Sequence, residues 1–361
     1  QPYNVESYIS EYAVTKNENL KYILLLNFGK MYSGPLYNAE GGRWLWKRNG
    51  KQNYIGDYGV FDAQEFGADV MVSAYEFTGN KKYLQRALDV IGRNRHALDN
   101  FGLLLEDTSG MPSVNTSAFA VKLLLKLYEY TGDAYWKERA IKILNATLYS
   151  RVYMEPYPPE DRWLNGALAR KNADWIGKSG PPLTGTDCGV PSETTYIPWL
   201  MEALVAGYSH TGDPMYIRYM EQLLHHQLEM NERAKKATFG QVELSGHYNM
   251  YTGEFDGEND GLTVVSNLFL FPYVKAFRQG FRSPHSSVVL MPGAGPDSVR
   301  IYHLSGRGES VSVVIPEGKK AVRLAATDIN GGKARNAGFR AAGGGVNFTA
   351  APYQMYELEV R

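Results

Sequence analysis

Tyr128-Glu-Tyr-Thr131-Gly132-Asp133 is one of four copies of a short phrase that decides the fold of this chain. The other copies begin at Tyr12, Tyr75 and Tyr208. Glycine at a helix C-terminus takes the left-handed conformation without a steric penalty. The Asn or Asp beside it can accept the free N–H groups that open the next helix. Each copy therefore predicts a tight turn between two antiparallel helices.

The helices on either side of these turns form repeated pairs. Five residues after each threonine of the phrase comes an apolar or aromatic residue: Leu20, Tyr83, Trp136 and Tyr216. The predicted pairs are 3–14 with 18–31, 60–78 with 80–97, 113–131 with 133–149, and 191–211 with 213–233, and a ninth helix covers 260–279. Apolar residues crowd several faces of the first members, while the second members carry more charge, which predicts inner and outer helices.

Long polar segments rich in Gly, Pro and aromatic residues precede the inner helices. They cover 32–59, 98–112, 150–190 and 234–259. Loops of this length are usually functional in compact domains. In a ring of hairpins they gather on one face, which predicts a binding cleft there.

The pattern changes after Gln279-Gly280. About six short apolar or alternating segments follow, separated by glycine-rich and proline-rich turns. This arrangement is typical of strands in a small antiparallel β-sandwich. We therefore predict a mainly α chain with a C-terminal β domain, divided into a helical domain over 1–282 and a sandwich over 285–361.

Composition and charge give no support to several classes of partner. The 361 residues are 44% hydrophobic, and 38 Lys and Arg balance 38 Asp and Glu. This balance gives no argument for nucleic acid or an anionic membrane as a partner, and no apolar run is long enough to span a bilayer. The single Cys188 cannot form an internal disulfide. Because the sequence begins at Gln1, we expect a processed, secreted or periplasmic protein, while a cytoplasmic location stays open.

A helical ring followed by a β-sandwich resembles the (α/α) toroid superfamily of glycoside hydrolases, polysaccharide lyases and sugar epimerases. The ending from Ala351 to Val360 is similar to the last strand of the accessory sandwiches in many carbohydrate-active enzymes. The resemblance implies an enzyme that acts on a poly- or oligosaccharide. The chain departs from this superfamily in its number of helical hairpins. It has four complete pairs, which is fewer than the ring of the superfamily commonly has.

The first candidate site lies at the start of the second inner helix. Asp57 and Tyr58 precede it, and Asp62 and Glu65 share one helical face. Asp62 is a candidate catalytic carboxylate, and Asp57 and Tyr58 are candidate substrate-binding residues. The alternative is structural, with Asp62 as an N-cap and Glu65 completing a capping box.

The second candidate site follows the longest loop. Asp187 and Glu193 are candidate catalytic carboxylates, and Tyr196 is a candidate substrate-binding residue. Part of this stretch also reads as helix initiation, because Ser192 is a natural N-cap. Cys188 is more often a packed residue than a nucleophile.

The third and densest candidate site covers 245–261. It holds the candidate catalytic residues His247, Tyr248, Tyr251 and Glu258 and the candidate substrate-binding residue Asn249. The acidic residues lack the full ligand set of an EF-hand calcium loop. The alternative is a solvated acidic turn before the last helix.

Further substrate-binding candidates are Asn115 at the start of the third inner helix, Trp44, Trp46, Arg162 and Trp163. Indole rings stack on sugars, and an arginine pairs with carboxylates. The alternatives are an N-cap for Asn115 and loop packing for the others.

Two mechanisms compete. Glycoside hydrolysis needs a protonated carboxylic acid and a second carboxylate. Asp62, Asp187, Glu193, Asp256 and Glu258 can supply them. Lyase or epimerase chemistry on a uronic acid needs a base such as His247, Tyr248 or Tyr251 and a group such as Asn115 beside the substrate carboxylate. Hydrolysis is favoured, because carboxylates flank at least three inner-helix starts and the chain is not basic. A non-catalytic glycan- or protein-binding toroid is the third alternative. No metal site is expected, and no glycine-rich phosphate loop calls for a nucleotide or redox cofactor.

Overall fold

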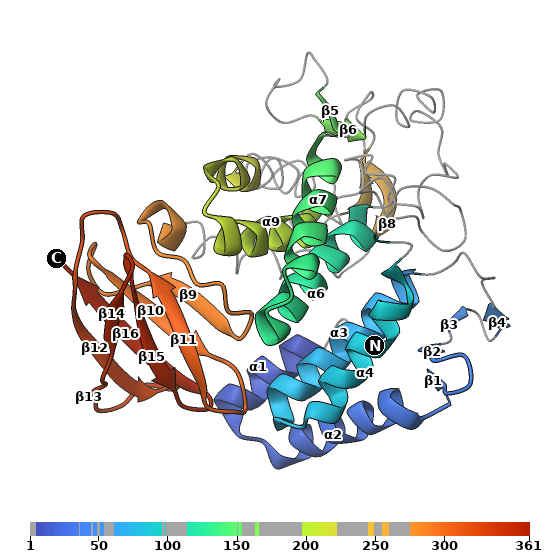
Figure 1. The fold of residues 1–361 in the computed structure, drawn as a ribbon, viewed down its shortest axis with the longest axis horizontal. Coiled ribbons are helices and arrows are strands. Elements are labelled where there is room, and N and C mark those ends of the chain that lie inside the picture. The colour runs from blue at the N-terminus through green and yellow to red at the C-terminus, as the bar shows by residue number, and fades with distance from the viewer. Residues whose placement is uncertain are drawn as a thin grey trace.

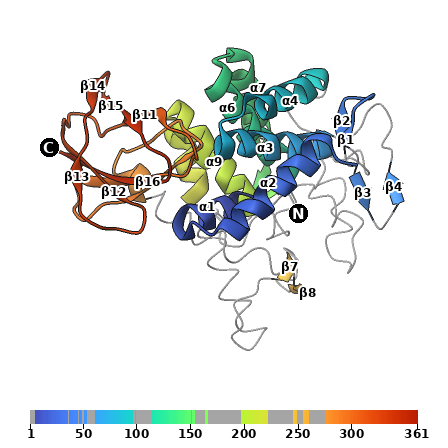
Figure 2. The same cartoon turned by 90° about the horizontal axis from the view of Figure 1, so that it is seen from below.

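Helices form the first part of the chain and antiparallel strands form its last part (Figure 1). The computed structural model describes residues 5–35, 37–44, 46–48, 51–53, 61–95, 98, 114–149, 151–153, 163–165, 197–221, 245–248, 255–259 and 275–361. In both views the C-terminal strands lie at one side of the helices (Figure 1, Figure 2). None of the helices in these ranges is long and apolar enough to cross a membrane.

The helices agree with the repeat. They are α1 Val5–Thr15, α2 Glu18–Ser33, α3 Phe61–Thr78, α4 Lys81–Arg93, α6 Val114–Thr131, α7 Ala134–Tyr149 and α9 Ile197–Thr211. Residues 214–221 and 275–278 are also helical. Every predicted helix with described residues is therefore present, and the described boundaries lie within a few residues of the predicted ones.

The four repeats form the predicted hinges. Gly79, Gly132 and Gly212 have φ angles of 71°, 70° and 73°, and Lys16 takes the same place in the first hinge with φ 53°. The backbone N–H of each glycine donates to the carbonyl four residues back, as from Gly132 to Tyr128 O at 2.7 Å. The next residue caps the following helix, as the Asn80 side chain does by accepting from Lys82 N at 3.1 Å. The positive φ explains the glycine of the repeat.

The threonine of each repeat completes the hinge, a role that the sequence analysis did not predict. Thr131 Oγ1 donates to Leu127 O at 2.6 Å and accepts from Asp133 N at 3.2 Å. The other three hinges contain the same pair of bonds. One hydroxyl thus links the end of one helix to the cap of the next.

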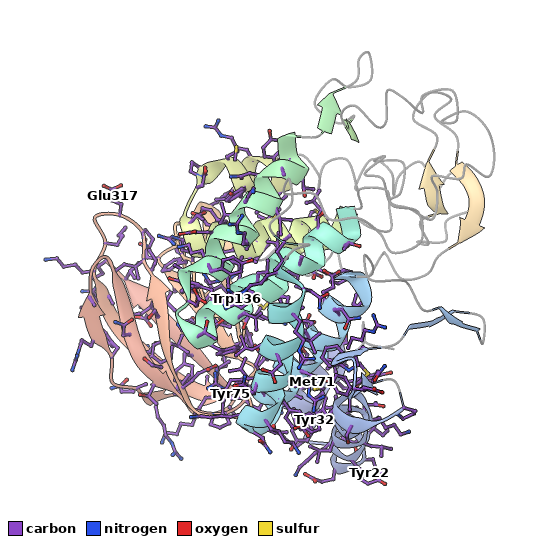
Figure 3. The ribbon with its side chains drawn as sticks, turned by 45° about the vertical axis from the view of Figure 1, so that its right-hand side comes forward. Tyr22, Tyr32, Met71, Tyr75, Trp136 and Glu317 are labelled. Atoms are coloured by element: carbon purple, nitrogen blue, oxygen red, sulfur yellow. The ribbon has the colours of Figure 1, made fainter. Side chains whose placement is uncertain are left out.

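Burial separates inner from outer helices as predicted in the second and third pairs. In the first pair it does not, because α1 buries only one face and α2 exposes Tyr22, Ile23, Leu25 and Leu26. The inner helices α3, α6 and α9 lie side by side in that order and bury apolar residues around most of their surface, including Met71 (Figure 3). The outer helix α4 buries one face and exposes polar residues such as Gln85 and Asp89 on the other. The aromatic or apolar residue after each hinge is buried in all four copies: Leu20, Tyr83, Trp136 and Tyr216.

The C-terminal strands form two antiparallel sheets. The strands are β9 Val288–Pro292, β10 Ser298–His303, β11 Glu309–Val314, β12 Ala321–Asp328, β13 Arg335–Asn336, β14 Arg340–Ala342, β15 Gly345–Ala350 and β16 Gln354–Val360. One sheet has the order β13-β12-β16-β10-β9 and the other β11-β15-β14. The rings of Phe348 and Tyr356, one from each sheet, lie 4.8 Å apart. Six strands match the predicted segments, and β13 and β14 were missed because they are short and exposed.

Four short hairpins complete the described strands. They pair β1 Tyr37–Asn38 with β2 Arg43–Trp44, β3 Trp46–Arg48 with β4 Lys51–Asn53, β5 Arg151–Tyr153 with β6 Trp163–Asn165, and β7 Ser245–Tyr248 with β8 Phe255–Asn259. They belong to the long polar segments, for which we predicted no structure.

Candidate functional site

The inner helices have two ends, and the C-terminal strands cover the end that carries the hinges. Val14 O accepts from Asn330 Nδ2 at 2.8 Å, and Ser209 O accepts from Arg282 Nη1 at 3.1 Å. Between them, Glu76 O accepts from Gly306 N at 3.0 Å. Three of the four hinges therefore bond to the C-terminal part through a main-chain carbonyl, and the hinge at Thr131 bonds to it through side chains.

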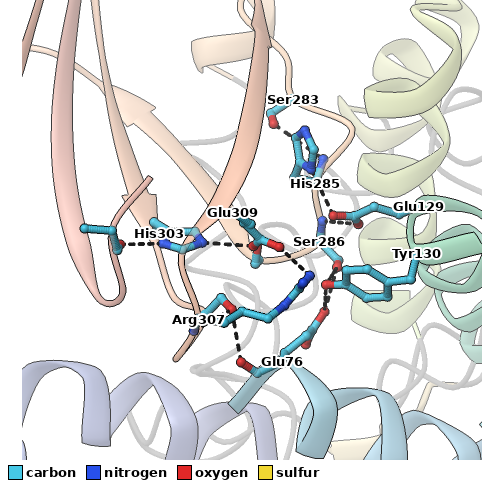
Figure 4. Close-up of polar contacts among 12 residues, drawn as sticks. Glu76, Glu129, Tyr130, Ser283, His285, Ser286, His303, Arg307 and Glu309 are labelled. Carbon is cyan, nitrogen blue, oxygen red and sulfur yellow. Dashed lines mark hydrogen bonds and ion pairs between the residues drawn. The ribbon is translucent and has the colours of Figure 1, made fainter. Parts of the chain in front are cut away.

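Two repeated glutamates converge on one turn at this covered end (Figure 4). Glu76 accepts from Ser286 Oγ at 2.8 Å and from Tyr130 Oη at 2.6 Å. Glu129, at the equivalent place in the next repeat, accepts from Ser286 N at 2.8 Å and lies 2.9 Å from His285 Nδ1. Because His285 Nε2 accepts from a backbone N–H at 3.0 Å, the ring proton is on Nδ1 and points at Glu129.

A third acid at this end, Glu309, has almost all of its acceptor positions occupied by donors. The Glu309 side chain is 9% exposed and accepts from Ser287 Oγ at 2.5 Å, and it lies 2.9 Å from His303 Nε2. It also pairs with the guanidinium of Arg307, which reaches Tyr75 Oη at 3.1 Å (Figure 4). Burial alone would raise the pKa of Glu309, but the bonds from His303 and Ser287 and the charge of Arg307 hold it below its usual value.

We call Glu76, Glu129 and Glu309, together with the groups that donate to them, the end-face network. The contacts of this network are of a structural kind. Each of its carboxylates is occupied by donors from the chain, and the C-terminal turn lies over it. Burial raises the pKa of Glu76. We did not predict this network. The sequence did contain a signal for it, because the second position of the repeat is a glutamate in copies two and three, Glu76 and Glu129.

A separate ion network links all four inner helices. Lys126 Nζ on α6 lies 2.6 Å from Glu6 on α1 and 2.9 Å from Asp69 on α3. One turn earlier, Lys122 Nζ lies 2.5 Å from Glu202 on α9 and 3.5 Å from Glu6. Lysines four residues apart share a helix face, so this face of α6 is directed at the carboxylates of its neighbours.

The ion network favours the charged forms of Glu6, Lys122 and Lys126. Lys122 and Lys126 hold the pKa of Glu6 well below its usual range. Burial alone would lower the pKa of Lys122 and of Lys126, yet the surrounding carboxylates raise both. A general acid must instead be protonated near the operating pH. Glu6 therefore does not supply the proton for hydrolysis. The signal that we missed was two lysines at this spacing inside an otherwise apolar inner helix.

The opposite end of the inner helices holds the first predicted site residues. Asp62 is the second residue of α3 and Asn115 is the second residue of α6. Both are helical, and no cap geometry is described at these two helix starts, so the N-cap and the site role both stay predictions. Their side chains lie outside the described residues. Glu65, one turn further along α3, is buried at 1% exposure.

Trp44 packs against the same end of α3. Its backbone exchanges two hydrogen bonds with the Gln64 side chain, at 2.9 and 3.0 Å, and its Nε1 donates to Met31 O at 2.8 Å. The ring is 3% exposed and lies so close to Gly67 that a Cβ there would meet it at 2.2 Å. This burial agrees with the packing alternative and gives no support to a role in substrate stacking.

The third candidate site includes one hairpin. His247 and Tyr248 lie on β7, opposite Asp256 and Phe255, and Glu258 lies on the partner strand β8. Trp46 lies on β3, and Trp163 lies on β6 opposite Tyr153. Only the backbone of these residues is described. Other predicted site residues lie outside the described part of the chain: Asp57, Tyr58, Arg162, Asp187, Glu193, Tyr196, Asn249 and Tyr251.

A metal site is not formed by the described side chains. Among them no group of three or more His, Cys, Asp or Glu residues could hold a metal ion.

Comparisons with known proteins identify similar solved structures. No protein-family model matches the chain, and no curated protein sequence matches it. The Lin0763 protein from Listeria innocua is similar over 79% of this chain and 73% of its own, with a TM-score of 0.52 and 13% identity. A D-mannose isomerase matches over 76% and 70%, with a TM-score of 0.52 and 16% identity.

A family 105 glycoside hydrolase from C. acetobutylicum matches 82% of this chain and 79% of its own, with a TM-score of 0.51 and 12% identity. At these identities the likeness shows a shared fold alone. The predicted resemblance to sugar-acting proteins built from helical hairpins is thus confirmed at the level of fold.

Proposed function

We propose that this chain is a carbohydrate-active enzyme that cleaves glycosidic bonds of a poly- or oligosaccharide. The observation that carries the proposal is the asymmetry of the inner helices. Their hinge end is covered by the C-terminal strands, and the start of α3 carries a predicted catalytic residue, Asp62. The fold shared with a glycoside hydrolase and a sugar isomerase supports the choice of substrate class.

The proposed architecture follows the same reasoning. The helical hairpins over 1–282 form an incomplete (α/α) toroid, and the two sheets over 285–361 form an accessory β-sandwich. The order α3, α6, α9 of neighbouring inner helices supports the ring. The contact between Phe348 and Tyr356 supports face-to-face packing of the sheets.

Hydrolysis at this end requires two carboxyl groups on either side of the scissile bond. One protonates the leaving oxygen, and the other acts as nucleophile or activates a water. We assign this pair to two of the three predicted carboxylates Asp62, Asp187 and Glu193. Helix N-termini carry partial positive charge, which stabilises a carboxylate placed in the first turn, where Asp62 lies.

Isomerisation or epimerisation of a sugar is the second candidate function. The fold shared with a D-mannose isomerase favours it over a non-catalytic role. Proton transfer at a sugar carbon needs a base, and His247 or Tyr248 on β7 would supply it.

The experiment incubates the purified chain with a panel of neutral and uronic-acid-containing oligosaccharides and polysaccharides and with free hexoses. Hydrolysis increases reducing ends without new ultraviolet absorbance, and elimination adds the absorbance of an unsaturated uronic acid. Isomerisation changes the sugar without changing the number of reducing ends. Hydrolysis is expected, and no turnover of any substrate would contradict the proposal.

Single variants then test the site. Asp62→Asn is expected to lower turnover by at least about a hundredfold with an unchanged melting temperature, because it removes a carboxylate in the reaction. The matched control is Glu359→Gln, which changes an exposed carboxylate paired with Arg323 on the C-terminal sheet. Full activity in Asp62→Asn would remove this residue from the site.

A further inference from the structure

Three arginines gather around the β1–β2 hairpin without an acidic partner. Arg43 lies on β2, and Arg86 and Arg93 lie seven residues apart on α4, so these two share one helix face. Among the described residues none of the three arginines has an ion-pair partner, and the buried Nε atom of Arg43 has no hydrogen-bond acceptor. In contrast, Lys126 and Arg307 pair with carboxylates.

The turn of the hairpin makes room for two of these guanidinium groups. Gly42 has a φ of 58°, and a Cβ there would meet Arg93 Nη1 at 2.0 Å. A Cβ at Gly41 would meet Arg43 Nε at 3.3 Å. Because these glycines have no side chain, both arginines can lie over neighbouring residues of one turn.

The third guanidinium group is held by aromatic rings. Arg86 Cζ lies 4.4 Å from the ring centre of Tyr32, which Figure 3 labels, and 3.9 Å from that of Tyr37. Stacking uses the flat faces of a guanidinium group and leaves the N–H groups at its edge able to donate. Lys82 Nζ lies 5.0 Å from the Tyr32 ring centre and adds a fourth cation.

The acidic residues near this cluster do not neutralise it. Asp89, between Arg86 and Arg93 on α4, accepts from Gln85 Nε2 at 2.8 Å, and Glu40 is exposed. The whole chain has equal numbers of acidic and basic residues, so the excess of cations here is local. A bound anion would relieve the repulsion among these cations.

The hairpin lies on the side where we propose that the substrate binds. In both views it lies away from the C-terminal strands (Figure 1, Figure 2). Trp44, which follows Arg43, exchanges hydrogen bonds with Gln64 near the start of α3. Gln64 follows the predicted catalytic residue Asp62 by two positions.

We propose that Arg43, Arg86 and Arg93 bind the carboxylate or sulfate groups of an acidic saccharide. The choice of a saccharide rests on the proposed function, and the unpaired arginines determine its acidic class. The fork of N–H groups on an arginine can donate two hydrogen bonds to one carboxylate or sulfate group.

Calorimetric titration tests the site without any need for turnover. The ligands are uronic-acid oligosaccharides, their carboxyl-reduced neutral forms and sulfated oligosaccharides. At least one acidic oligosaccharide is expected to bind about tenfold or more tightly than the neutral forms, and added salt is expected to weaken its binding. The two acidic groups of ligands distinguish carboxylate from sulfate. Equal affinity for neutral and acidic ligands, or no binding of any acidic ligand, would overturn the proposal.

Variants then locate the binding. Arg43→Gln and Arg93→Gln are each expected to lower the affinity by about tenfold or more, because each removes a charged donor. Arg93→Lys keeps the charge but not the fork of N–H groups, so it is expected to restore only part of the affinity. The matched control is Arg335→Gln, which removes an exposed arginine on β13. Wild-type affinity in both hairpin variants, or an equal loss in Arg335→Gln, would contradict the site.

Binding and turnover together separate this inference from the proposed function. Binding of acidic oligosaccharides without turnover of any saccharide would keep the site and contradict the enzyme. Turnover of neutral saccharides without binding of acidic ones would keep the enzyme and overturn the site. An oligonucleotide of equal charge that binds as tightly as the acidic saccharides would show a general attraction for anions and would also overturn it.

Discussion

The two ends of the inner helices differ in what their polar residues do. At the hinge end Glu76, Glu129 and Glu309 bind donors supplied by the chain, and the C-terminal strands cover them. At the opposite end, Asp62 and Asn115 stand in the first turns of α3 and α6. The comparison teaches that the hinge-end carboxylates, whose oxygens already accept from the chain, are the weaker catalytic candidates.

The largest stability effect is expected between the two ends, at Lys126. Its side chain is 7% exposed and lies 2.6 Å from Glu6 and 2.9 Å from Asp69. Lys126→Met leaves these carboxylates facing each other, so the free energy of unfolding is expected to fall by about 3–5 kcal/mol in urea denaturation. Lys319→Met, which removes a lysine paired with Asp297 at the exposed surface, is expected to change it by less than about 1 kcal/mol. Equal effects of the two variants would refute a structural ion network.

Glu309→Gln is expected to weaken the covered end. The variant leaves buried His303 and Arg307 without the charge that they face. A loss of about 2–4 kcal/mol in the free energy of unfolding is expected. Glu359→Gln, on β16 of the other C-terminal sheet and exposed, is the control, and a loss no larger than in that control would show that the end-face network contributes little to folding.

Acid is expected to destabilise the hinge end through His210. Burial, and then chiefly the positive charges of Lys137 and Arg282, lower its pKa from 6.5 to about 4. The unfolded chain therefore binds a proton below pH 6.5 that the folded chain refuses until about pH 4, so stability is complete above this window and falls as the pH falls through it.

This contribution is measured against His210→Phe, which does not titrate. Between about pH 7 and about pH 4.5, the wild type is expected to lose about 2 kcal/mol more than the variant. Parallel curves for the two proteins would show that His210 titrates normally in the folded state.

The smallest effect concerns the hinges. Gly132 has a φ of 70° and a Cβ there would meet nothing within 4 Å, so Gly132→Ala is expected to cost about 1 kcal/mol by backbone strain alone. Gly92, inside α4, has the same open surroundings without a positive φ, and Gly92→Ala is expected to stabilise by about 0.5 kcal/mol. Thermal unfolding measures both, and equal signs would contradict the role of the hinge glycine.

Local signals made the fold predictable. The repeated phrase contains both the residue that needs a positive φ, such as Gly132, and the cap that follows it, so each hinge is encoded within six residues. The strands followed from alternation in the same way. Among the C-terminal strands only β13 and β14 escaped, because two or three exposed residues carry no alternating signal. The short strands β1 to β8 of the long polar segments were not predicted either.

Contacts between distant segments were not predictable. Nothing near Glu76 in the sequence indicates Ser286, which lies 210 residues further along the chain. The same holds for Lys126 and Glu6. For Trp44 the sequence allowed either stacking on a sugar or packing inside the protein. Only the burial of its ring against α3 distinguishes the two roles. The roles assigned to Glu193 and its neighbours stay predictions.

A paired measurement of turnover and melting temperature tests the difference between the two ends most directly. Glu193→Gln is expected to lower turnover by about a thousandfold and to keep the wild-type melting temperature. Glu129→Gln, at the covered end, is expected to lower the melting temperature and to keep turnover within about twofold when assayed well below it. The reverse pattern, with activity lost in Glu129→Gln and kept in Glu193→Gln, would place the chemistry at the hinge end and contradict the account.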